Sequence, residues 1–353
     1  MNAIFLYCRT GFENECAAEI VDKAAHFGFS GFCKAKPQSG YVVFTADEPA
    51  EVALLHRQLP IGELIFCRQW FVILGMRNDL PTDNRISPLL RILKLAPGSG
   101  DQVMVGTTDT NEGKQLSPLC RKLTPLLQKE LNTLKPTADE HPQITLHICF
   151  LSTHAAYAGY ALTSNSEPWT MGVPRLKFPR QAPSRSTLKL EEGFLRLLTT
   201  DEKVRLLKPG MRATDLGAAP GGWTWQLVKR HMQVIAVDNA NLQAELLDSG
   251  LVEHVRADGF CYRPSQPVDW MVCDIIDRPQ RVVERASLWL TSGWCKQTIF
   301  NLKLPMKQRY QQTQECLTYI RNQLGNHRIA YRLACKQLYH DREEVTVFAR
   351  VMD

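Results

Sequence analysis

The sequence contains no uninterrupted apolar run that is long enough to cross a membrane. Its start, MNAIFLYCRTGFENE, has a short apolar run but neither a basic beginning nor a small-residue cleavage site, so we expect a strand there and no signal peptide. Internal repeats and low-complexity tracts are also missing. These absences indicate a globular protein without membrane contact, and a length of 353 residues fits two or three domains.

Paired cysteine motifs are missing as well. The eleven cysteines are scattered singly, and no C-x-x-C pair occurs. An odd number of isolated cysteines is typical of reduced core thiols, so we expect a cytoplasmic protein without disulfides, and we predict no metal site. The formal net charge of +6 permits a polyanionic partner but does not require one.

The first part of the chain is predicted to form two compact α+β modules without a catalytic signature. Module 1–75 begins with a strand, an amphipathic helix and a hairpin, and it ends with an edge strand near residue 75. Module 76–165 combines a strand, a helix with leucines at helical spacing and one or two long strands. The expected elements are the strand 3–8, the helix 12–27, the hairpin turn near Ser39-Gly40, the strand 102–109, the helix 116–134 and the strand region 143–162.

A proline-rich linker is expected over residues 166–185, because Pro168, Pro174, Pro179 and Pro183 exclude a continuous helix or central strand. The same stretch carries the cations Arg175, Lys177, Arg180 and Arg185 around the aromatic Phe178. Two interpretations stay open. It is either a solvated connector or an RNA-binding surface whose cations follow phosphates.

Residues 186–353 alternate between strand and helix patterns, which predicts an α/β domain with a mostly parallel sheet covered on both faces. The expected strands are 212–217, 233–238, 253–257, 268–274, 297–303, 329–338 and 344–351, and the expected helices are 186–198, 222–231, 279–290 and 306–324.

The segment TDLGAAPGGW, within residues 212–230, predicts a ligand-binding turn between a strand and a helix. Gly217, Gly221 and Gly222 lie where backbone passes close to a ligand. The spacing differs from the G-x-G-x-x-G of dinucleotide enzymes, and GTTDTNEGK lacks the glycine spacing and the hydroxyl residue of a nucleotide-triphosphate loop. An adenosyl ligand is therefore favoured.

Two acidic residues follow the next strands. Asp238 ends the apolar strand QVIAVD, where an acid can hold a ribose diol, and Asp258 in RADGF can accept a hydrogen bond from an adenine amino group. The turn and both acids lie at the carboxyl edge of the predicted sheet. This combination makes S-adenosylmethionine the best candidate for the cofactor.

Four more charged residues fall at element ends on that edge: Lys189, Asp274, Lys303 and Glu344. Each alone is compatible with an ordinary salt bridge, but together they suit methyl transfer to a ribose hydroxyl, which must lose its proton. We expect Lys303 to be the base, with a pKa lowered by burial and by Lys189. Asp274 is expected beside the sulfonium, and Glu344 is expected to orient Lys189.

The motifs SRSTLKLEE, DLGAAPGGWTWQLVKR, MVCD, NLKLPMKQRY and LYHDREEVTV closely resemble the bacterial 23S ribosomal RNA cytidine 2'-O-ribose methyltransferases, relatives of the FtsJ-type ribose methyltransferases. With CRTGFENECAAEI and MGVPRLKFP, the resemblance runs the full length. It implies a ferredoxin-like module, a THUMP RNA-binding module and a Rossmann-like methyltransferase domain over 186–353. It further implies 23S ribosomal RNA as the partner and a cytidine in the peptidyl transferase loop as the target; no obligate protein partner is expected.

The resemblance also implies specific residues. A Lys-Asp-Lys-Glu tetrad falls on Lys189, Asp274, Lys303 and Glu344, although Glu343 adjoins the last position and side chains alternate along a strand. Ala219 stands where the family has cysteine, a small-for-small change. The implied cofactor contacts are Ser186, Ala219, Pro220, Gly221, Gly222, Asp238, Asp258 and Asp274.

Three other functions remain as alternatives. A base-directed RNA methyltransferase is not supported. Methylation of a base amino group would need an N/D-P-P-aromatic segment after the fourth strand, where this chain reads CDIIDRPQ. Methylation of cytosine C5 would need an activated cysteine, and Cys273 is not part of a Pro-Cys element. A nicotinamide oxidoreductase shares an acid on the second strand but needs a different phosphate loop. A non-catalytic RNA-binding ribosome assembly factor would have no need of both lysines.

Overall fold

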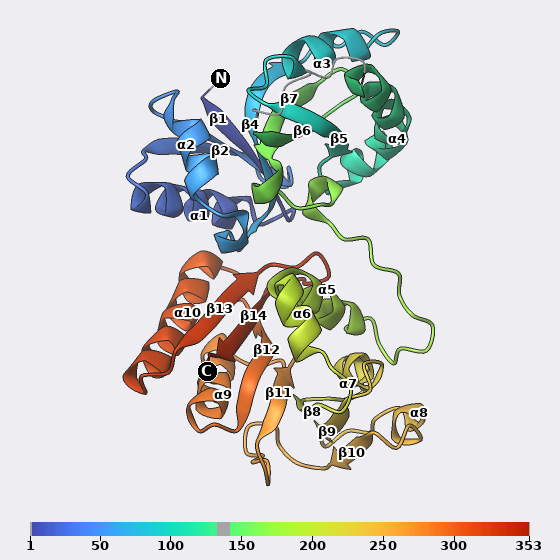
Figure 1. Ribbon diagram of the computed structural model, residues 1–353, viewed down its shortest axis with the longest axis vertical. Helices are drawn as coiled ribbons and strands as arrows, with labels where there is room; N and C mark the ends of the chain where they lie inside the picture. The colour runs from blue at the N-terminus through green and yellow to red at the C-terminus, as the bar shows by residue number, and fades with distance from the viewer. Residues whose placement is uncertain (1, 133–141, 353) are drawn as a thin grey trace. The chain divides into compact units, whose positions relative to one another are not determined.

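The computed structural model describes residues 2–132 and 142–352, and the chain divides into two compact units, Met1–Val173 and Pro174–Asp353. Figure 1 shows the first unit from blue to green and the second from yellow-green to red. The division falls inside the proline-rich stretch expected at 166–185. Within that stretch, no helix or strand lies between the short 3-10 helix η3 (Thr170–Gly172) and α5 (Thr187–Leu197).

The first unit is built on one seven-stranded sheet with the order β2-β3-β1-β4-β7-β6-β5. All neighbouring strands are antiparallel except β5 and β6. The strands are β1 (Ala3–Cys8), β2 (Gly31–Ala35), β3 (Tyr41–Ala46), β4 (Cys67–Arg77), β5 (Ser99–Thr107), β6 (Gln143–Phe150) and β7 (Ala156–Leu162). Because the sheet is continuous, both predicted α+β modules contribute strands to it.

Strand β4 lies in the middle of this sheet, so its prediction as an edge strand was wrong. It pairs with β1 on one side and β7 on the other, and it extends past the expected boundary at residue 75. Neighbouring residues Trp70 and Phe71 point to opposite faces, and both are fully buried. A strand that is buried on both faces is typical of the interior of a sheet.

Within the described part of this unit there are four α-helices: α1 (Glu13–His26), α2 (Glu51–Gln58), α3 (Ile86–Leu93) and α4 (Asn111–Asn132). Two further 3-10 helices are η1 (Ile61–Glu63) and η2 (Thr163–Asn165). The patterns predicted α1 and α4 but missed α2 and α3, which are only eight residues long. Residues 133 and 134 of the predicted helix 116–134 lie outside the described residues.

The second unit contains a seven-stranded, mostly parallel sheet, as predicted, with the order β10-β9-β8-β11-β12-β14-β13. Only β14 runs against its neighbours. The strands are β8 (Arg212–Leu216), β9 (Gln233–Val237), β10 (Val252–Val255), β11 (Val268–Cys273), β12 (Cys295–Lys303), β13 (Tyr331–Lys336) and β14 (Glu344–Val351). The strand order reverses at β8, and open α/β sheets bind ligands at the carboxyl edge beside such a reversal.

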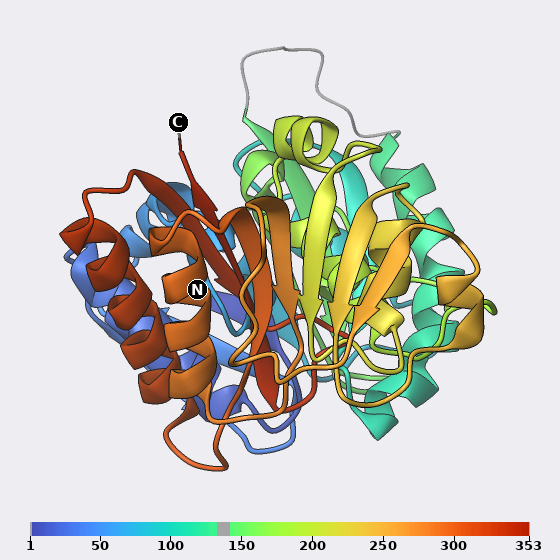
Figure 2. The ribbon, with the colours of Figure 1, turned by 90° about the horizontal axis from the view of Figure 1, so that it is seen from below.

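Helices cover both faces of this sheet, because the right-handed crossovers β8-α7-β9 and β11-α9-β12 run in opposite directions along it. Figure 2 shows α9 and α10 side by side. Trp270 on β11 lies in the core under α5 to α7 and donates a 2.7 Å hydrogen bond to the Leu206 carbonyl. The helices are α5 (Thr187–Leu197), α6 (Thr200–Leu206), α7 (Gly222–Val228), α8 (Ala244–Leu247), α9 (Pro279–Thr291) and α10 (Arg309–Asn326).

All eleven cysteines are free thiols, as predicted, and nine of them are buried. Cys33 is half-buried, and Cys261 is exposed, so Cys261 departs from the expectation of a core thiol. Among the helices of the described residues, none combines the length and the apolar character needed to span a bilayer.

Candidate active site

Four charged side chains meet at the carboxyl edge of the second sheet; we call Lys189, Asp274, Lys303 and Glu344 the charged tetrad. Asp274 directly follows β11, Lys303 is the last residue of β12, and Glu344 is the first residue of β14. Lys303 and Glu344 are direct partners in the antiparallel register of β12 and β14. Lys189 comes from the first turn of α5. The fold thus brings together all four residues that the sequence predicted.

Within the charged tetrad, each ammonium contacts both carboxylates. The Lys189 Nζ lies 2.5 Å from a Glu344 oxygen and 3.2 Å from Asp274 Oδ2. The Lys303 Nζ lies 2.7 Å from Asp274 Oδ1 and also contacts the second Glu344 oxygen. Two positive and two negative groups therefore alternate, and they compensate one another's charge in a place where their side chains are at most 20% exposed.

The electrostatics of Lys303 differ from the expectation. Burial alone would lower the pKa of its ammonium, but the adjacent Asp274 and Glu344 carboxylates raise that pKa well above its ordinary value. The prediction of a lowered pKa was wrong for this state of the protein, because it gave more weight to Lys189 than to two carboxylates in direct contact. Lys303 is held as an ammonium here.

Glu344, rather than its neighbour Glu343, faces the lysines. The Glu344 side chain is 5% exposed, whereas Glu343 is 60% exposed and pairs with Arg309 at 2.7 Å. Glu344 is the first residue of β14, whereas Glu343 lies just before the strand, and consecutive side chains of an extended chain point to opposite sides.

Behind the charged tetrad lies a chain of polar side chains that the sequence analysis missed. Asn301 donates a 2.8 Å hydrogen bond to Asp274 Oδ1, and the Thr346 hydroxyl donates a 2.7 Å hydrogen bond to Asn301 Oδ1. Thr346 also lies 3.0 Å from Asp341, whose pKa is raised well above its ordinary value by burial and by Glu344. A protonated Asp341 can donate to the Thr346 oxygen, which leaves the hydroxyl proton for Asn301.

A signal for these residues exists in the sequence. Asn301 lies two positions before Lys303, and Thr346 lies two positions after Glu344, so each shares a strand face with a member of the charged tetrad. They are also direct partners in the register of β12 and β14. The sequence analysis could therefore have added Asn301 and Thr346 to the candidate site, because they are polar residues at alternate positions in otherwise apolar strands.

The glycine turn has the backbone that the sequence predicted. Gly217 and Gly221 have φ of +74° and +113°, a region that favours glycine. A Cβ at Gly217 would lie 2.4 Å from an Ile275 side-chain carbon, and a Cβ at Gly222 would lie 2.3 Å from the hydroxyls of Ser184 and Ser186. The glycines thus allow the chain itself to pack closely around the turn, and the close approach of a ligand stays a prediction.

The acid at the end of β9 supports the turn directly. Asp238 Oδ2 accepts a 3.0 Å hydrogen bond from the Ala219 N–H, and its Oδ1 accepts one of 2.8 Å from Ala240. Asp258 is exposed and accepts a hydrogen bond from the Phe260 N–H at 2.8 Å. Each carboxylate oxygen can accept more than one hydrogen bond, so both acids can also bind hydroxyl or amino groups of a ligand.

Ser186 and Pro220 lie next to the same turn. Ser186 precedes α5, and its carbonyl accepts a 3.1 Å hydrogen bond from the Trp223 indole of α7. Pro220 follows Ala219 in the turn through a cis peptide bond. The proposed RNA-binding cations Arg175, Lys177, Arg180 and Arg185 are all exposed, together with Phe178.

Three family models match different parts of the chain. They are described as the RlmM ferredoxin-like domain at residues 1–71, the N-terminal part of ribosomal RNA large subunit methyltransferase M at residues 84–162, and an FtsJ-like methyltransferase at residues 183–291.

Curated relatives match the chain over nearly its full length. Ribosomal RNA large subunit methyltransferase M of Cellvibrio japonicus is 51% identical over 352 residues, which are 99% of this chain and 100% of that protein. The proteins of the same name from Cronobacter sakazakii and Escherichia coli O127:H6 are 48% and 47% identical, and each match covers 99% of this chain and 96% of the relative.

Proposed function

Because the chain belongs to the family of ribosomal RNA large subunit methyltransferase M, we propose that it methylates the ribose 2'-hydroxyl of a cytidine in the peptidyl transferase loop of 23S ribosomal RNA. The methyl donor is S-adenosylmethionine. The observation that carries the proposal is the charged tetrad, which lies beside a glycine turn at the carboxyl edge of the sheet.

The residues of the turn fit this donor. Bound S-adenosylmethionine supplies a methyl group on a positively charged sulfur. Asp238 is suited to its ribose hydroxyls and Asp258 to its adenine amino group, because both carboxylates keep free acceptor positions. The backbone of Ala219 to Gly222, together with Ser186, borders the site. Asp274 lies between the glycine turn and the two lysines and accepts a hydrogen bond from each lysine.

Lys303 is the proposed base. With the donor bound, transfer would form a bond between the 2'-oxygen and the methyl carbon and break the bond between that carbon and sulfur, and the Lys303 Nζ would accept the hydroxyl proton. Lys303 can accept that proton only as a neutral amine, and Asp274 and Glu344 make this form scarce. Lys189, held by Glu344, is placed to donate a hydrogen bond to the same oxygen. Precise placement of the hydroxyl therefore carries much of the rate increase.

The rest of the chain is assigned to RNA positioning. A ribosomal RNA is far larger than the active site, and contacts to phosphates set the register of a protein on its RNA. Arg175, Lys177, Arg180 and Arg185 are exposed and suited to phosphates. Residues 76–165 are proposed as the THUMP module that the resemblance implies. A ribosomal RNA substrate implies that the protein acts in the bacterial cytoplasm.

The test is to map ribose methylation in 23S ribosomal RNA from cells with and without the gene. We expect one cytidine of the peptidyl transferase loop to lose its 2'-O-methyl group without the gene and to regain it when purified protein and donor are added. If the methylation map does not change, the proposal is wrong. S-adenosylmethionine, but not NAD, should raise the melting temperature, which separates this function from the oxidoreductase alternative.

A further inference from the structure

One face of strand β2, at the edge of the first sheet, is exposed, whereas Phe5 and Val43 on the same face of β1 and β3 are buried. Helix α1 covers the opposite face, where Cys33 of β2 donates a hydrogen bond to the Ala17 carbonyl of α1. Because side chains alternate along a strand, Phe32 and Lys34 point away from α1. Phe32 is 51% exposed, an unusual position for a phenylalanine in a sheet.

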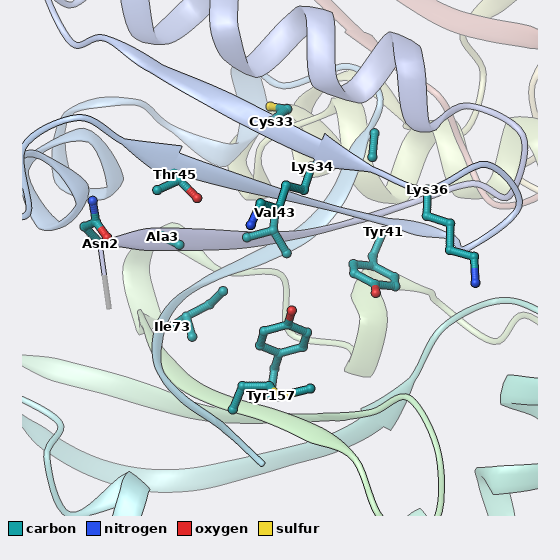
Figure 3. A pocket seen from close by; sticks show the side chains of 12 residues that line it. Asn2, Ala3, Cys33, Lys34, Lys36, Tyr41, Val43, Thr45, Ile73 and Tyr157 are labelled. Atoms are coloured by element: carbon teal, nitrogen blue, oxygen red, sulfur yellow. The ribbon is translucent and has the colours of Figure 1, made fainter. Parts of the chain in front are cut away.

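This open face leads into a cleft with a volume of about 700 Å³. Figure 3 shows its walls: Lys34, Lys36 and Tyr41 come from the β2–β3 hairpin, and Tyr157 comes from β7. Asn2 and Thr45 add small polar groups. Of the described residues that line the cleft, none is acidic, and neither lysine forms an ion pair with a described residue. The cleft therefore has a positive charge and no internal counter-charge.

The aromatic rings in the cleft are held in place from behind. The Tyr41 ring is stacked on Phe5, with ring centroids 4.9 Å apart and an angle of 9° between the planes. Phe5 is stacked in turn on Phe71 at 4.9 Å, and Tyr157 packs against Phe5 at 5.3 Å. Figure 3 shows the hydroxyls of Tyr41 and Tyr157 turned toward each other. Fixed rings lose little conformational entropy when a ligand binds to them.

We propose that this cleft binds an unpaired nucleotide segment of the RNA substrate, with bases stacked on Tyr41 and Tyr157, and with phosphates at Lys34 and Lys36. A further base can stack on Phe32, which does not line the cleft but is the cross-strand partner of Thr45 at its wall. The inference deepens the proposed function, on which it rests for the identity of the ligand as RNA. Cations next to aromatic rings suit single-stranded RNA, because every base offers a face for stacking and every linkage carries a negative charge. Double-stranded RNA would leave the rings unused, and an acidic peptide offers few flat groups to stack on them.

The experiment measures binding of the full-length protein to a labelled, unstructured oligoribonucleotide of about ten nucleotides over a range of salt concentrations. We expect Tyr157→Leu to weaken binding by about 5- to 100-fold without a change in the salt dependence, and Tyr157→Phe to bind as the wild type does. Lys34→Gln with Lys36→Gln should lower the slope of log K against log salt by about 0.7 per lysine. Lys23→Gln on α1 is the matched control. It should change the affinity and the salt slope less than the double lysine variant does.

Phe32→Ser keeps the test decisive if Tyr157→Leu fails to fold, because Phe32 is half exposed and its loss leaves the core intact. Wild-type binding by Phe32→Ser, Tyr157→Leu and the double lysine variant would overturn the inference. An equal loss for a perfect RNA duplex would also overturn it, since stacking requires unpaired bases. If the wild type methylates 23S ribosomal RNA while these variants bind normally, only the cleft assignment fails. If the variants lose binding but the wild type shows no methyl transfer, only the proposed function fails.

Discussion

Lys303 and Glu344 are direct cross-strand partners, and the Lys303 ammonium contacts the Glu344 carboxylate. The same ammonium lies 2.7 Å from Asp274 Oδ1. Because Glu344 contacts Lys189 as well, no member of the charged tetrad can be changed without leaving a buried charge uncompensated. Losing one lysine leaves excess negative charge at the sheet edge, and losing one acid leaves excess positive charge. Variants of this site must therefore be tested for stability and donor binding as well as for activity.

Replacing Lys303 with alanine should lower kcat/KM for methyl transfer by about 10² to 10⁴, the usual contribution of a positioned base. RNA binding should stay within about twofold of wild type, because the charged tetrad occupies a small part of a large RNA contact surface. Single-turnover methyl transfer and RNA binding are the measurements. Lys307→Ala, at an exposed position four residues later, is the control. Full methyl transfer by a Lys303→Ala protein that binds RNA normally would remove Lys303 from the role of base.

The rate should rise with pH. Asp274 and Glu344 raise the pKa of Lys303, so the neutral amine is a minor form that increases about tenfold per pH unit below that pKa. We expect log kcat/KM to increase with a slope of about 1 between about pH 7 and 9. Glu344→Gln removes one of the two carboxylates that raise the pKa, so its rate should level off at a lower pH. A flat profile for the wild type would show that the deprotonation of Lys303 does not limit the rate.

The sequence predicted the strands of the second sheet well because most of them are short apolar runs between polar segments, but it missed the short helices α6 and α8. The prediction 344–351 for the last strand matches β14 at both ends. The charged tetrad could be found because its members lie at or near the ends of elements at the carboxyl edge of the sheet, where side chains converge. The direction of the Lys303 pKa shift could not be predicted, because it depends on how close Lys303 lies to Asp274 and Glu344. These two residues are 29 and 41 positions away from Lys303 in the sequence.

In the first unit, the sequence missed features that depend on strand pairing. The position of β4 at the centre of the sheet follows from its pairing with β1 and β7, which local patterns do not encode. The cleft between the β2–β3 hairpin and Tyr157 was missed for the same reason, because its two walls are more than 100 residues apart. Local patterns identified the helices α1 and α4, whose amphipathic faces are long enough to show a period.

Removing the polar support behind Asp274 should slow the reaction without loss of RNA binding. Asn301→Leu deletes the 2.8 Å hydrogen bond to Asp274 and leaves Thr346 without its acceptor. We expect about a 10- to 100-fold loss of kcat, on the order of 1.4 to 2.8 kcal/mol, as expected when a hydrogen bond to a charged group is lost. Thr346→Val should lose less, and Thr346→Ser should restore the rate because it keeps the hydroxyl. If Asn301→Leu raised KM for RNA and left kcat unchanged, Asn301 would have no part in positioning Asp274.

Gly217 and Gly210 form a matched pair that separates backbone strain from crowding. Both have positive φ, +74° and +80°, but a Cβ at Gly217 would approach Ile275 closely, whereas a Cβ at Gly210 has open space around it. Gly210→Ala should lower the free energy of unfolding by about 1 to 2 kcal/mol, the cost of this backbone region for alanine. Gly217→Ala should cost about 1 to 3 kcal/mol more and weaken donor binding, because Ile275 directly follows Asp274 and must move. Urea unfolding and calorimetric donor titration measure both effects; equal costs for the two variants would contradict the crowding argument.

The first unit should lose stability in mild acid because of two buried histidines. Burial lowers the pKa of both His147 and His56 to about 3, and no described residue accepts or donates a hydrogen bond at either Nε2. Both imidazoles are neutral in the folded protein but become protonated in the unfolded chain below about pH 6.5, so the free energy of unfolding falls as the pH drops from about 6.5 toward 3. At pH 5 the loss is about 2 kcal/mol for each histidine.

His147→Phe should remove half of this acid sensitivity, since it keeps a flat ring stacked on Phe71, from which His147 lies 5.3 Å at an angle of 5°. The second unit should respond differently, because burial raises the pKa of Asp215 to about 7. The folded state then binds a proton that the unfolded state releases, so protonation of Asp215 adds stability between about pH 7 and 4. Hydrogen exchange of each unit, corrected for the intrinsic effect of pH, separates the two responses. A His147→Phe protein that loses as much stability between pH 7 and 5 as the wild type would show that His147 is not the source.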